Sequence, residues 1–277
     1  MKTFLTNYKK SKFCKNFKKK FLCKLKEIKI ITFPDGEKII KIEKKIKKEV
    51  NLIFIIKGNI NIRLIELIMI LDVLKEKKIN LIMPYFPYSR QDKKENGSFN
   101  SKLISKIINK FKLKKIITFD LHSEYIKFLY NCKFINIKTT KIINKISNKK
   151  TIVFTDIGSY KRFGEKSNKN KIIFEKNRNK KKVKVRQLNK TNKKNRKIII
   201  IDDIIDSGKT FKEIHKKIKK IGFKKIYAYF THLLIKNKVK LFDEIKKIYT
   251  TDSIETYIKN IKVISLCNII KKKYIYD

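Results

Sequence analysis

The chain has 277 residues, and 42% of them are hydrophobic, which is ample for a globular protein. Its 73 lysines and arginines against 24 acidic residues give a formal charge of +49. The lysines are spread through every segment together with Ile and Asn, which points to an AT-rich coding sequence and argues against a specific nucleic-acid surface, where lysines would gather on one face among aromatic side chains.

The cysteines and the hydrophobic stretches indicate in which cellular compartment the protein is expected. None of the four cysteines lies in a C-x-x-C pair, and the three histidines do not lie at zinc-finger spacing from them. Lysine interrupts every hydrophobic stretch, so we expect neither a membrane span nor a membrane partner. The sequence therefore predicts a cytoplasmic protein with free thiols. A basic transit segment is the alternative, because Lys9–Lys24 has no acidic residue and some amphipathic spacing.

The first part of the chain is expected to form a short strand and a helix, followed by a strand at Ile28–Phe33. The next segment, F-P-D-G-E, is typical of a turn, and on its own it favours a plain hairpin loop. The alternative is a purine site, in which Phe33 stacks on the base while Asp35 and Glu37 accept hydrogen bonds from its exocyclic amine. The helix would place four apolar residues on one side, namely Phe13, Phe17, Phe21 and Leu22.

Two strand–helix pairs follow, at 52–75 and at 79–111. The second strand ends in P-Y-F-P-Y-S-R-Q-D-K-K, and Ser98 and Ser101 are candidate caps for the helix after it. Loops at the carboxyl ends of parallel strands hold the ligands of many α/β proteins, although a stiff aromatic turn with surface charges explains this segment about as well. The candidate binding residues in it are Arg90, Gln91 and Asp92.

A further strand at Ile116–Phe119 ends in D-L-H-S-E. His122 has carboxylates on both sides and is a candidate metal ligand or proton carrier, although a lone buried histidine satisfied by a neighbour is the commoner case. The strand at Thr151–Thr155 repeats the pattern and brings Asp156 to the same kind of edge.

Between 176 and 197 the sequence is dominated by Lys, Asn and Arg, and it predicts for most of its length a solvated loop. The alternation at 183–185 could be a strand within it. A basic loop beside a phosphate site can close over a polyphosphate and neutralise the charge that develops during transfer. Lys176 and Arg178 follow the strand at Ile172–Phe174 and are best placed for that role.

The most informative segment is I-I-I-I-D-D-I-I-D-S-G-K-T at 198–210. The four isoleucines predict a short buried strand, followed by an acidic loop and a helix from near Phe211. Asp202 and Asp203 suit sugar hydroxyls or a divalent cation, and a Walker A loop is disfavoured because Asp203 stands where that motif needs a glycine. The helix N-terminus suits a phosphate monoester, which would be held by Asp206, Ser207, Gly208, Lys209 and Thr210.

The remaining sequence continues the alternation, with strands expected at 226–230, 247–251 and 261–266. We therefore expect two successive α/β domains with a boundary near 138–150. Their carboxyl-edge loops carry nearly all of the distinctive residues.

Four of these segments together resemble one family, ribose-phosphate pyrophosphokinase (phosphoribosyl pyrophosphate synthetase). F-P-D-G-E is similar to its adenine-contacting F-x-D-G-E, and P-Y-F-P-Y-S-R-Q-D-K-K to its P-Y-x-x-Y-[AS]-R-Q-D-[RK]-[RK]. T-F-D-L-H-S-E resembles its T-[VF]-D-L-H-x-[EP], and 201–210 resembles its phosphoribosyl-binding loop. The resemblance implies an α/β fold of two tandem phosphoribosyltransferase-like domains with mainly parallel central sheets, with ATP-binding loops in 1–140 and the ribose 5-phosphate loop in 141–277.

The resemblance also implies an activity, which is transfer of the pyrophosphoryl group of ATP to O1 of ribose 5-phosphate with Mg²⁺ as cofactor. His122 and Asp156 would then hold Mg²⁺, Lys176 and Arg178 would stabilise the transition state, and Asp202 and Asp203 would hold the ribose hydroxyls. Residues 206–210 would bind the 5-phosphate. The nucleotide would be bound by Phe33, Asp35, Glu37, Arg90, Gln91 and Asp92, in part from a neighbouring subunit of a homo-oligomer built from dimers, up to a hexamer.

Two other functions stay open at this point. A phosphoribosyltransferase that consumes phosphoribosyl pyrophosphate would keep 202–210 but has no need of the F-P-D-G-E and R-Q-D segments. A catalytically inactive synthetase-like subunit would be expected to lose His122, Lys176 or Arg178, and all three are present. The chain departs from the family at Lys209, where a small residue is usual, and at Asn177, where an arginine is usual. It also lacks the family's glutamines and glycine at 125–130, so regulation is not carried over.

Overall fold

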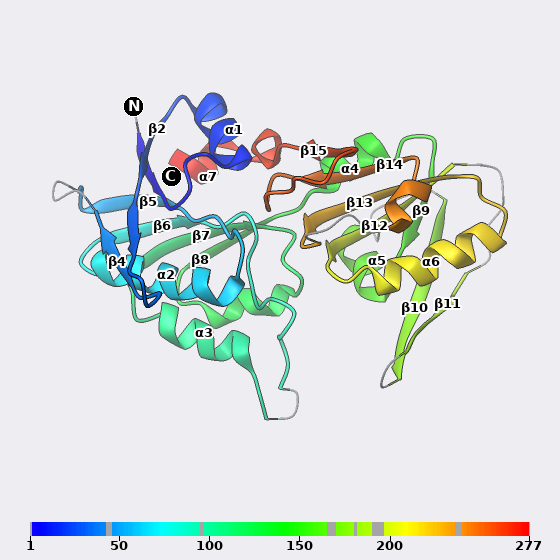
Figure 1. The fold of residues 1–277 in the computed structure, drawn as a ribbon, viewed down its shortest axis with the longest axis horizontal. Coiled ribbons are helices and arrows are strands. Elements are labelled where there is room, and N and C mark those ends of the chain that lie inside the picture. The colour runs from blue at the N-terminus through cyan, green and yellow to red at the C-terminus, as the bar shows by residue number, and fades with distance from the viewer. Residues whose placement is uncertain are drawn as a thin grey trace. The chain divides into compact units, whose positions relative to one another are not determined.

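The computed structural model describes residues 2–42, 46–94, 97–164, 170–179, 182–189, 197–235 and 240–276, with the backbone alone at 176–179, 182–185 and 240–241. The chain forms two compact units (Figure 1). Unit 1 comprises Met1–Ile137, Asp252–Glu255 and Ser265–Asp277, and unit 2 comprises Lys138–Thr251 and Thr256–Ile264. The second unit therefore differs from the predicted second domain, 141–277, because the last part of the chain packs in unit 1.

The core of unit 1 is a sheet of six parallel strands in the order β2-β1-β5-β6-β7-β8. These strands are β1 (Thr3–Thr6), β2 (Lys24–Glu27), β5 (Glu49–Ile53), β6 (Lys78–Ile82), β7 (Leu113–Phe119) and β8 (Lys133–Ile137). Helices connect and cover them: α1 (Lys12–Phe21), α2 (Ile60–Val73), α3 (Asn100–Ile108), the 3-10 turns η1 (Glu124–Leu129) and η3 (Leu266–Ile269), and α7 (Lys272–Tyr276). A separate antiparallel pair, β3 (Lys29–Thr32) and β4 (Lys38–Lys41), forms a hairpin.

Helix α1 forms as the spacing of its phenylalanines predicts. Phe13, Phe17 and Phe21 are buried, and the rings of Phe17 and Phe21 lie 4.6 Å apart. Leu22 was predicted on the same face and is instead 77% exposed. The reason is local, because Leu22 ends the helix in a left-handed conformation with φ of 46°, which turns its side chain away from the helix face.

The last part of the chain returns to α1. Lys20 Nζ donates to the carbonyl of Cys267 at 2.5 Å, and the Tyr276 hydroxyl donates to the carbonyl of Phe21 at 3.0 Å. Asp252 accepts from Asn16 Nδ2 and from the backbone N–H of Leu266, both at 2.8 Å. Unit 1 is therefore completed by residues more than two hundred positions away from its first strand.

Unit 2 is built on a seven-stranded sheet in the order β11-β10-β9-β12-β13-β14-β15, parallel except for β10 with β11. Its core includes the four isoleucines Ile198–Ile201, each 0% exposed, as expected for a strand covered on both faces. The strands are β9 (Thr151–Phe154), β10 (Lys171–Asn179), β11 (Lys182–Gln187), β12 (Lys197–Ile205), β13 (Lys225–Leu233), β14 (Lys247–Thr251) and β15 (Ile261–Ile264). The helices are α4 (Thr140–Ile146), α5 (Ile157–Phe163), α6 (Lys209–Lys220) and the 3-10 turn η2 (Lys240–Glu244).

Two predictions about unit 2 are wrong. Strand β12 continues to Ile205, so Asp202 and Asp203 lie within the strand and not in a loop after it, because Ile204 and Ile205 keep the segment buried. Most of the basic segment after Phe174 was predicted as a loop, but β10 runs on to Asn179 and pairs with β11, which confirms the strand suggested at 183–185. Residues 190–196 of that segment lie outside the described part of the chain.

Within the described ranges, no helix combines the length and the apolar character that a membrane crossing demands.

Candidate active site

Unit 2 gathers polar side chains where β9 and β12 lie side by side. The Thr155 hydroxyl donates to Asp202 Oδ2 at 2.6 Å, and Asp202 Oδ1 accepts from the backbone N–H of Asp203 at 2.9 Å. Arg162 Nη2 donates to Asp203 Oδ1 at 2.8 Å and lies 3.4 Å from Asp202 Oδ1. We call these four residues, Thr155, Arg162, Asp202 and Asp203, the carboxylate cluster.

The surroundings of Asp202 in the carboxylate cluster disfavour its charged form. Burial is the main cause that raises the pKa of Asp202 well above its usual value, and the charge of Asp203 beside it adds to the rise. Asp156 contributes in the same direction, while Arg162 opposes the shift. Two adjacent acids, one of them with a raised pKa, near the carboxyl edge of a parallel sheet are typical of a ligand site.

The sequence alone missed Arg162, which comes from α5. The helix begins at the cap Asp156, whose Oδ1 accepts from the backbone N–H of Ser159 at 2.7 Å, and the Ser159 hydroxyl donates to the carbonyl of Ile201 at 2.9 Å. A side chain at Gly158 would meet Arg162 Nη1 at 3.1 Å and Asp156 Oδ1 at 3.2 Å, so the glycine leaves room for the arginine. The available signal was the spacing from the cap, which places Arg162 on the first helical turns after an acidic strand end.

The segment after β12 reverses direction at Gly208 and enters α6. Gly208 has φ of +71°, a conformation that other residues adopt with strain, and Lys209 is the first residue of the twelve-residue helix. Asp206, Ser207 and Lys209 are exposed, and Thr210 is half-buried. The first turn of α6 has no side-chain cap and begins just after an acidic strand end, which suits an anion with attached hydroxyls.

In unit 1 the residues that follow β7 are held by hydrogen bonds to residues at the end of β8. Asp120 is completely buried and has φ of 38°, and its N–H donates to the carbonyl of Ile137 at 3.2 Å. The next residue is fixed by Asn136, whose Oδ1 accepts from the N–H of Leu121 at 3.0 Å. His122 follows as a half-buried side chain. The turn therefore fixes the backbone just before His122.

The loop after β6 is shaped by a tyrosine and a serine. Tyr88 has φ of 59°, and its hydroxyl donates to Asn61 Oδ1 at 2.7 Å. Ser101 was predicted as a helix cap, but its hydroxyl donates to the carbonyl of Tyr88 at 2.7 Å, and α3 begins after Phe99 without a side-chain cap. Arg90 and Gln91 are exposed and Asp92 is half-buried, so all three predicted residues are accessible on one loop.

The F-P-D-G-E segment forms the tip of the β3–β4 hairpin. Phe33 donates its N–H to the carbonyl of Glu37 at 2.8 Å, and Asp35 Oδ1 accepts from the N–H of Glu37 at 2.9 Å. Gly36 has φ of +96°. The side chains of Phe33, Asp35 and Glu37 are exposed, so the loop is a formed turn that presents an aromatic ring and two carboxylates to solvent.

The predicted sites thus fall into separate groups. One edge of the unit 2 sheet carries Asp156, Asp202, Asp203 and 206–210. Unit 1 carries His122 and the residues predicted to bind the nucleotide, which are Phe33, Asp35, Glu37, Arg90, Gln91 and Asp92. Lys176 and Arg178 pair through their backbones with Val185 and Val183 of β11, and their side chains lie outside the described part. Among the described residues, three or more His, Cys, Asp or Glu side chains do not come together as a ready metal cluster.

Comparison with known proteins adds family evidence to this geometry. The model of the N-terminal domain of ribose phosphate pyrophosphokinase matches residues 2–111, and the model of the phosphoribosyl transferase domain matches residues 139–267. The ribose-phosphate pyrophosphokinase of Thermosipho africanus is 30% identical, with 83% of this chain and 79% of that protein aligned. The ribose-phosphate pyrophosphokinase of Mycoplasmopsis pulmonis is also 30% identical, with 90% of this chain and 85% of that protein aligned.

The fold comparison agrees. The crystal structure of phosphoribosylpyrophosphate synthetase from Mycobacterium smegmatis matches with a TM-score of 0.84 and 17% identity, covering 99% of this chain and 98% of that chain. The predicted α/β fold, with two mainly parallel sheets in tandem phosphoribosyltransferase-type domains, is confirmed.

Proposed function

The chain belongs to the ribose-phosphate pyrophosphokinase family, and we therefore propose that it converts ATP and ribose 5-phosphate into AMP and 5-phosphoribosyl 1-pyrophosphate. The observation that carries this proposal is the carboxylate cluster beside the N-terminus of α6. It offers hydroxyl acceptors and an anion site on the same edge of one sheet, which are the two features that a sugar phosphate requires.

In the proposed reaction, O1 of ribose 5-phosphate attacks the β-phosphorus of ATP. The bond from that phosphorus to the α,β-bridging oxygen breaks, AMP leaves with the electron pair, and the O1 proton passes to solvent. Such transfer depends on positioning and on neutralising the phosphoryl oxygens, with little covalent chemistry for the protein. Asp202 and Asp203 would orient the ribose hydroxyls, 206–210 would hold the 5-phosphate, and Lys176 and Arg178 would meet the charge that develops during transfer.

The unit 1 loops would serve the nucleotide. Phe33 would stack on adenine while Asp35 and Glu37 accept from its amine, and the loop residues Arg90, Gln91 and Asp92 would meet the rest of ATP. The side chains of the hairpin tip and of Arg90 and Gln91 are exposed and Asp92 is half-buried, which supports this role.

Magnesium fits the donor set of these sites. Mg²⁺ on a nucleotide keeps waters and phosphate oxygens as ligands and takes only one or two protein groups, so a cluster of three acidic side chains is not required. His122 would offer a half-buried imidazole nitrogen, and Asp156 a carboxylate that also accepts from Ser159. A bound ion would offset the negative charge of the ATP phosphates.

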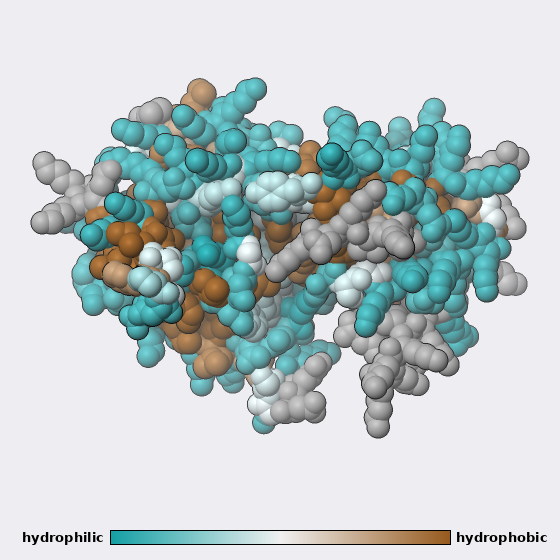
Figure 2. All heavy atoms as spheres, in the orientation of Figure 1, coloured by the Kyte–Doolittle hydropathy of each residue, from teal (hydrophilic) through white to brown (hydrophobic). Residues whose placement is uncertain are grey.

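A homo-oligomer is also part of the proposal. Five large apolar side chains on α2 and the β3–β4 hairpin are between 40% and 56% exposed, and Figure 2 shows hydrophobic surface over the α2 side of unit 1. Apolar patches of this kind commonly mark contact between chains. The five residues of this patch are Phe33, Ile39, Ile62, Ile65 and Val73.

A cytoplasmic location agrees with the four free cysteines.

The test of the proposed function is direct. Purified protein given ATP, Mg²⁺ and ribose 5-phosphate is expected to release AMP in equal amount to 5-phosphoribosyl 1-pyrophosphate, measured by chromatography. Folded protein that releases no AMP at any ionic strength would be an inactive homologue. Protein that instead consumes added 5-phosphoribosyl 1-pyrophosphate in the presence of a nucleobase, with release of pyrophosphate, would be a phosphoribosyltransferase.

Replacing His122 with alanine is expected to raise KM for Mg-ATP about 10- to 100-fold, which is the usual loss when a group that supports a bound metal is removed. KM for ribose 5-phosphate should stay the same, because the carboxylate cluster is untouched. The measurement is initial rate against each substrate, repeated with Mn²⁺ in place of Mg²⁺. An unchanged KM for Mg-ATP with both metals would remove His122 from the site.

A further inference from the structure

The β3–β4 hairpin has little apolar packing of its own. It forms a two-stranded sheet that shares no ladder with the six-stranded sheet of unit 1. Each of its eight strand residues is half-buried or exposed, so the hairpin has no fully buried side chain. An isolated two-stranded hairpin is marginally stable in water, so something else must fix its position.

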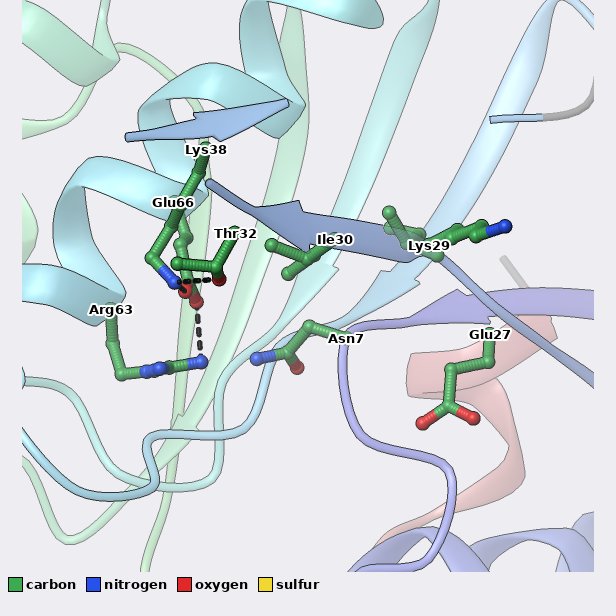
Figure 3. A pocket seen from close by; sticks show the side chains of 9 residues that line it. Asn7, Glu27, Lys29, Ile30, Thr32, Lys38, Arg63 and Glu66 are labelled. Atoms are coloured by element: carbon green, nitrogen blue, oxygen red, sulfur yellow. Dashed lines mark hydrogen bonds and ion pairs between the residues drawn. The ribbon is translucent and has the colours of Figure 1, made fainter. Parts of the chain in front are cut away.

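A charged group on α2 supplies that connection. Glu66 is 0% exposed, and its Oε1 lies 3.3 Å from Lys38 Nζ, while its Oε2 lies 2.5 Å from Arg63 Nη1. Lys38 is the first residue of β4, and its Nζ also donates to the Thr32 hydroxyl at 2.8 Å, at the end of β3 (Figure 3). Lys38 therefore joins both ends of the loop Phe33–Glu37 to a single buried carboxylate.

The space beside this contact is not filled by apolar side chains. An open pocket of about 490 Å³ lies there, with mostly polar and charged walls that include Asn7, Glu27, Thr32, Lys38, Arg63 and Glu66. Figure 3 shows Lys38, Thr32 and Arg63 converging on Glu66 at one side of the pocket, with Asn7 and Glu27 farther along. Because this open pocket borders the hairpin and none of the hairpin's strand residues is fully buried, the Lys38–Glu66 contact contributes to holding the hairpin on α2.

We propose that Glu66 is a positioning residue for the nucleotide base, acting through Lys38 on the hairpin tip that carries Phe33, Asp35 and Glu37. This inference rests on the proposed function, because it takes the hairpin tip as the adenine-binding loop. The ion pair is partly withdrawn from water, with side-chain exposures of 17% for Lys38 and 1% for Glu66, so it is screened less than a surface pair.

Two variants separate this role from a general effect on stability. Lys38→Met removes the tether to the hairpin but keeps the apolar stem of the side chain, and Glu66 retains Arg63 as a counter-charge. Arg63→Met removes the other cation from the same carboxylate and leaves the hairpin tethered. The two variants change the charge by the same amount at the same acid, so each controls for the other.

Lys38→Met is expected to raise KM for ATP about tenfold, since small displacements of a positioning group weaken productive binding steeply. KM for ribose 5-phosphate should not change, and the preference for ATP over GTP should fall. Arg63→Met should leave KM for ATP within about twofold of the parent. Hydrogen exchange of residues 29–41 should accelerate in Lys38→Met alone, because the hairpin opens more often without its tether.

The outcomes are distinguishable. Unchanged exchange of 29–41 in Lys38→Met would show that the tether is absent, and faster exchange with unchanged KM for ATP would show that it does not position the base. A similar rise of both KM values, in either variant, would indicate general loss of stability. If the parent protein releases no AMP, the proposed function fails on its own, and the dissociation constant for ATP measured by calorimetry then takes the place of KM in the same comparison.

Discussion

Replacing Lys176 with alanine is expected to lower turnover about 100- to 1000-fold while leaving both KM values within about twofold, because a cation that meets charge developing in the transition state contributes little to ground-state binding. The expectation follows from the E-K-N-R segment, where a basic side chain follows the buried part of β10 in the same sheet as the carboxylate cluster. A single-turnover measurement with saturating ATP and ribose 5-phosphate reports the chemical step directly.

The matched control is Lys197→Ala, which removes an exposed lysine from the start of β12 in the same sheet. It should leave turnover unchanged, since one charge among many on a basic surface affects substrate approach only weakly in moderate salt. A Lys176→Ala protein that turns over at the parent rate would show that another cation, such as Arg178, stabilises the transition state.

Replacing Asp202 with asparagine is expected to have opposite effects on binding and on stability. Affinity for ribose 5-phosphate should fall about 10- to 100-fold, because the carboxyl group that orients a ribose hydroxyl is replaced by an amide with a single acceptor oxygen. Stability at neutral pH should rise, because the amide removes a buried negative charge that lies beside Asp203 and near Asp156. The Thr155 hydroxyl can still donate to the amide oxygen.

The sign of the pH dependence follows from the raised pKa of Asp202. Its folded state prefers the protonated acid, so this group stabilises the protein most below its unfolded pKa of about 3.9, and the contribution is lost as pH rises through the folded pKa. Each unit between the two pKa values corresponds to about 1.4 kcal/mol in the free energy of unfolding. The advantage of Asp202→Asn should therefore grow from about pH 4 upward and then level off.

Urea unfolding at a series of pH values, with no Mg²⁺ added, measures this difference. Asp72→Asn makes the same chemical change on an α2 side chain that is 63% exposed, and it serves as the control for the substitution itself. A parent protein that gains stability relative to Asp202→Asn as pH rises would show that Arg162 and Thr155 compensate the buried charge fully.

Some features of the site could be predicted because they depend on short stretches of sequence. Four isoleucines followed by acids and an S-G-K-T segment specify a buried strand and a helix N-terminus whatever the rest of the chain does. The hairpin tip follows from Pro and Gly in one turn. The residue roles themselves stay predictions until the variants are measured.

Other features depend on partners that are distant in sequence. Arg162 meets the acids of β12, about forty positions further along, only when α5 packs against that strand. In the sequence it is one basic residue among many lysines. Glu66 looked like one polar residue on an apolar helix, and its contact with Lys38 requires the hairpin to fold over α2. Strand β10 continues past its last apolar residue because the backbone of β11 pairs with it. Amino-acid composition alone does not predict such backbone pairing.

Because residues 265–276 pack against α1, the two units cannot complete their folding in the order in which they are synthesised. A ribosome releases the six-stranded sheet of unit 1 early, whereas the segment that holds Lys20 and the carbonyl of Phe21 emerges only after nearly all of unit 2. Unit 2 can close first, since most of it is one continuous stretch, 138–251. Unit 1 therefore begins to form before unit 2 but is completed after it, and the surface of α1 stays uncovered until residues 265–276 emerge.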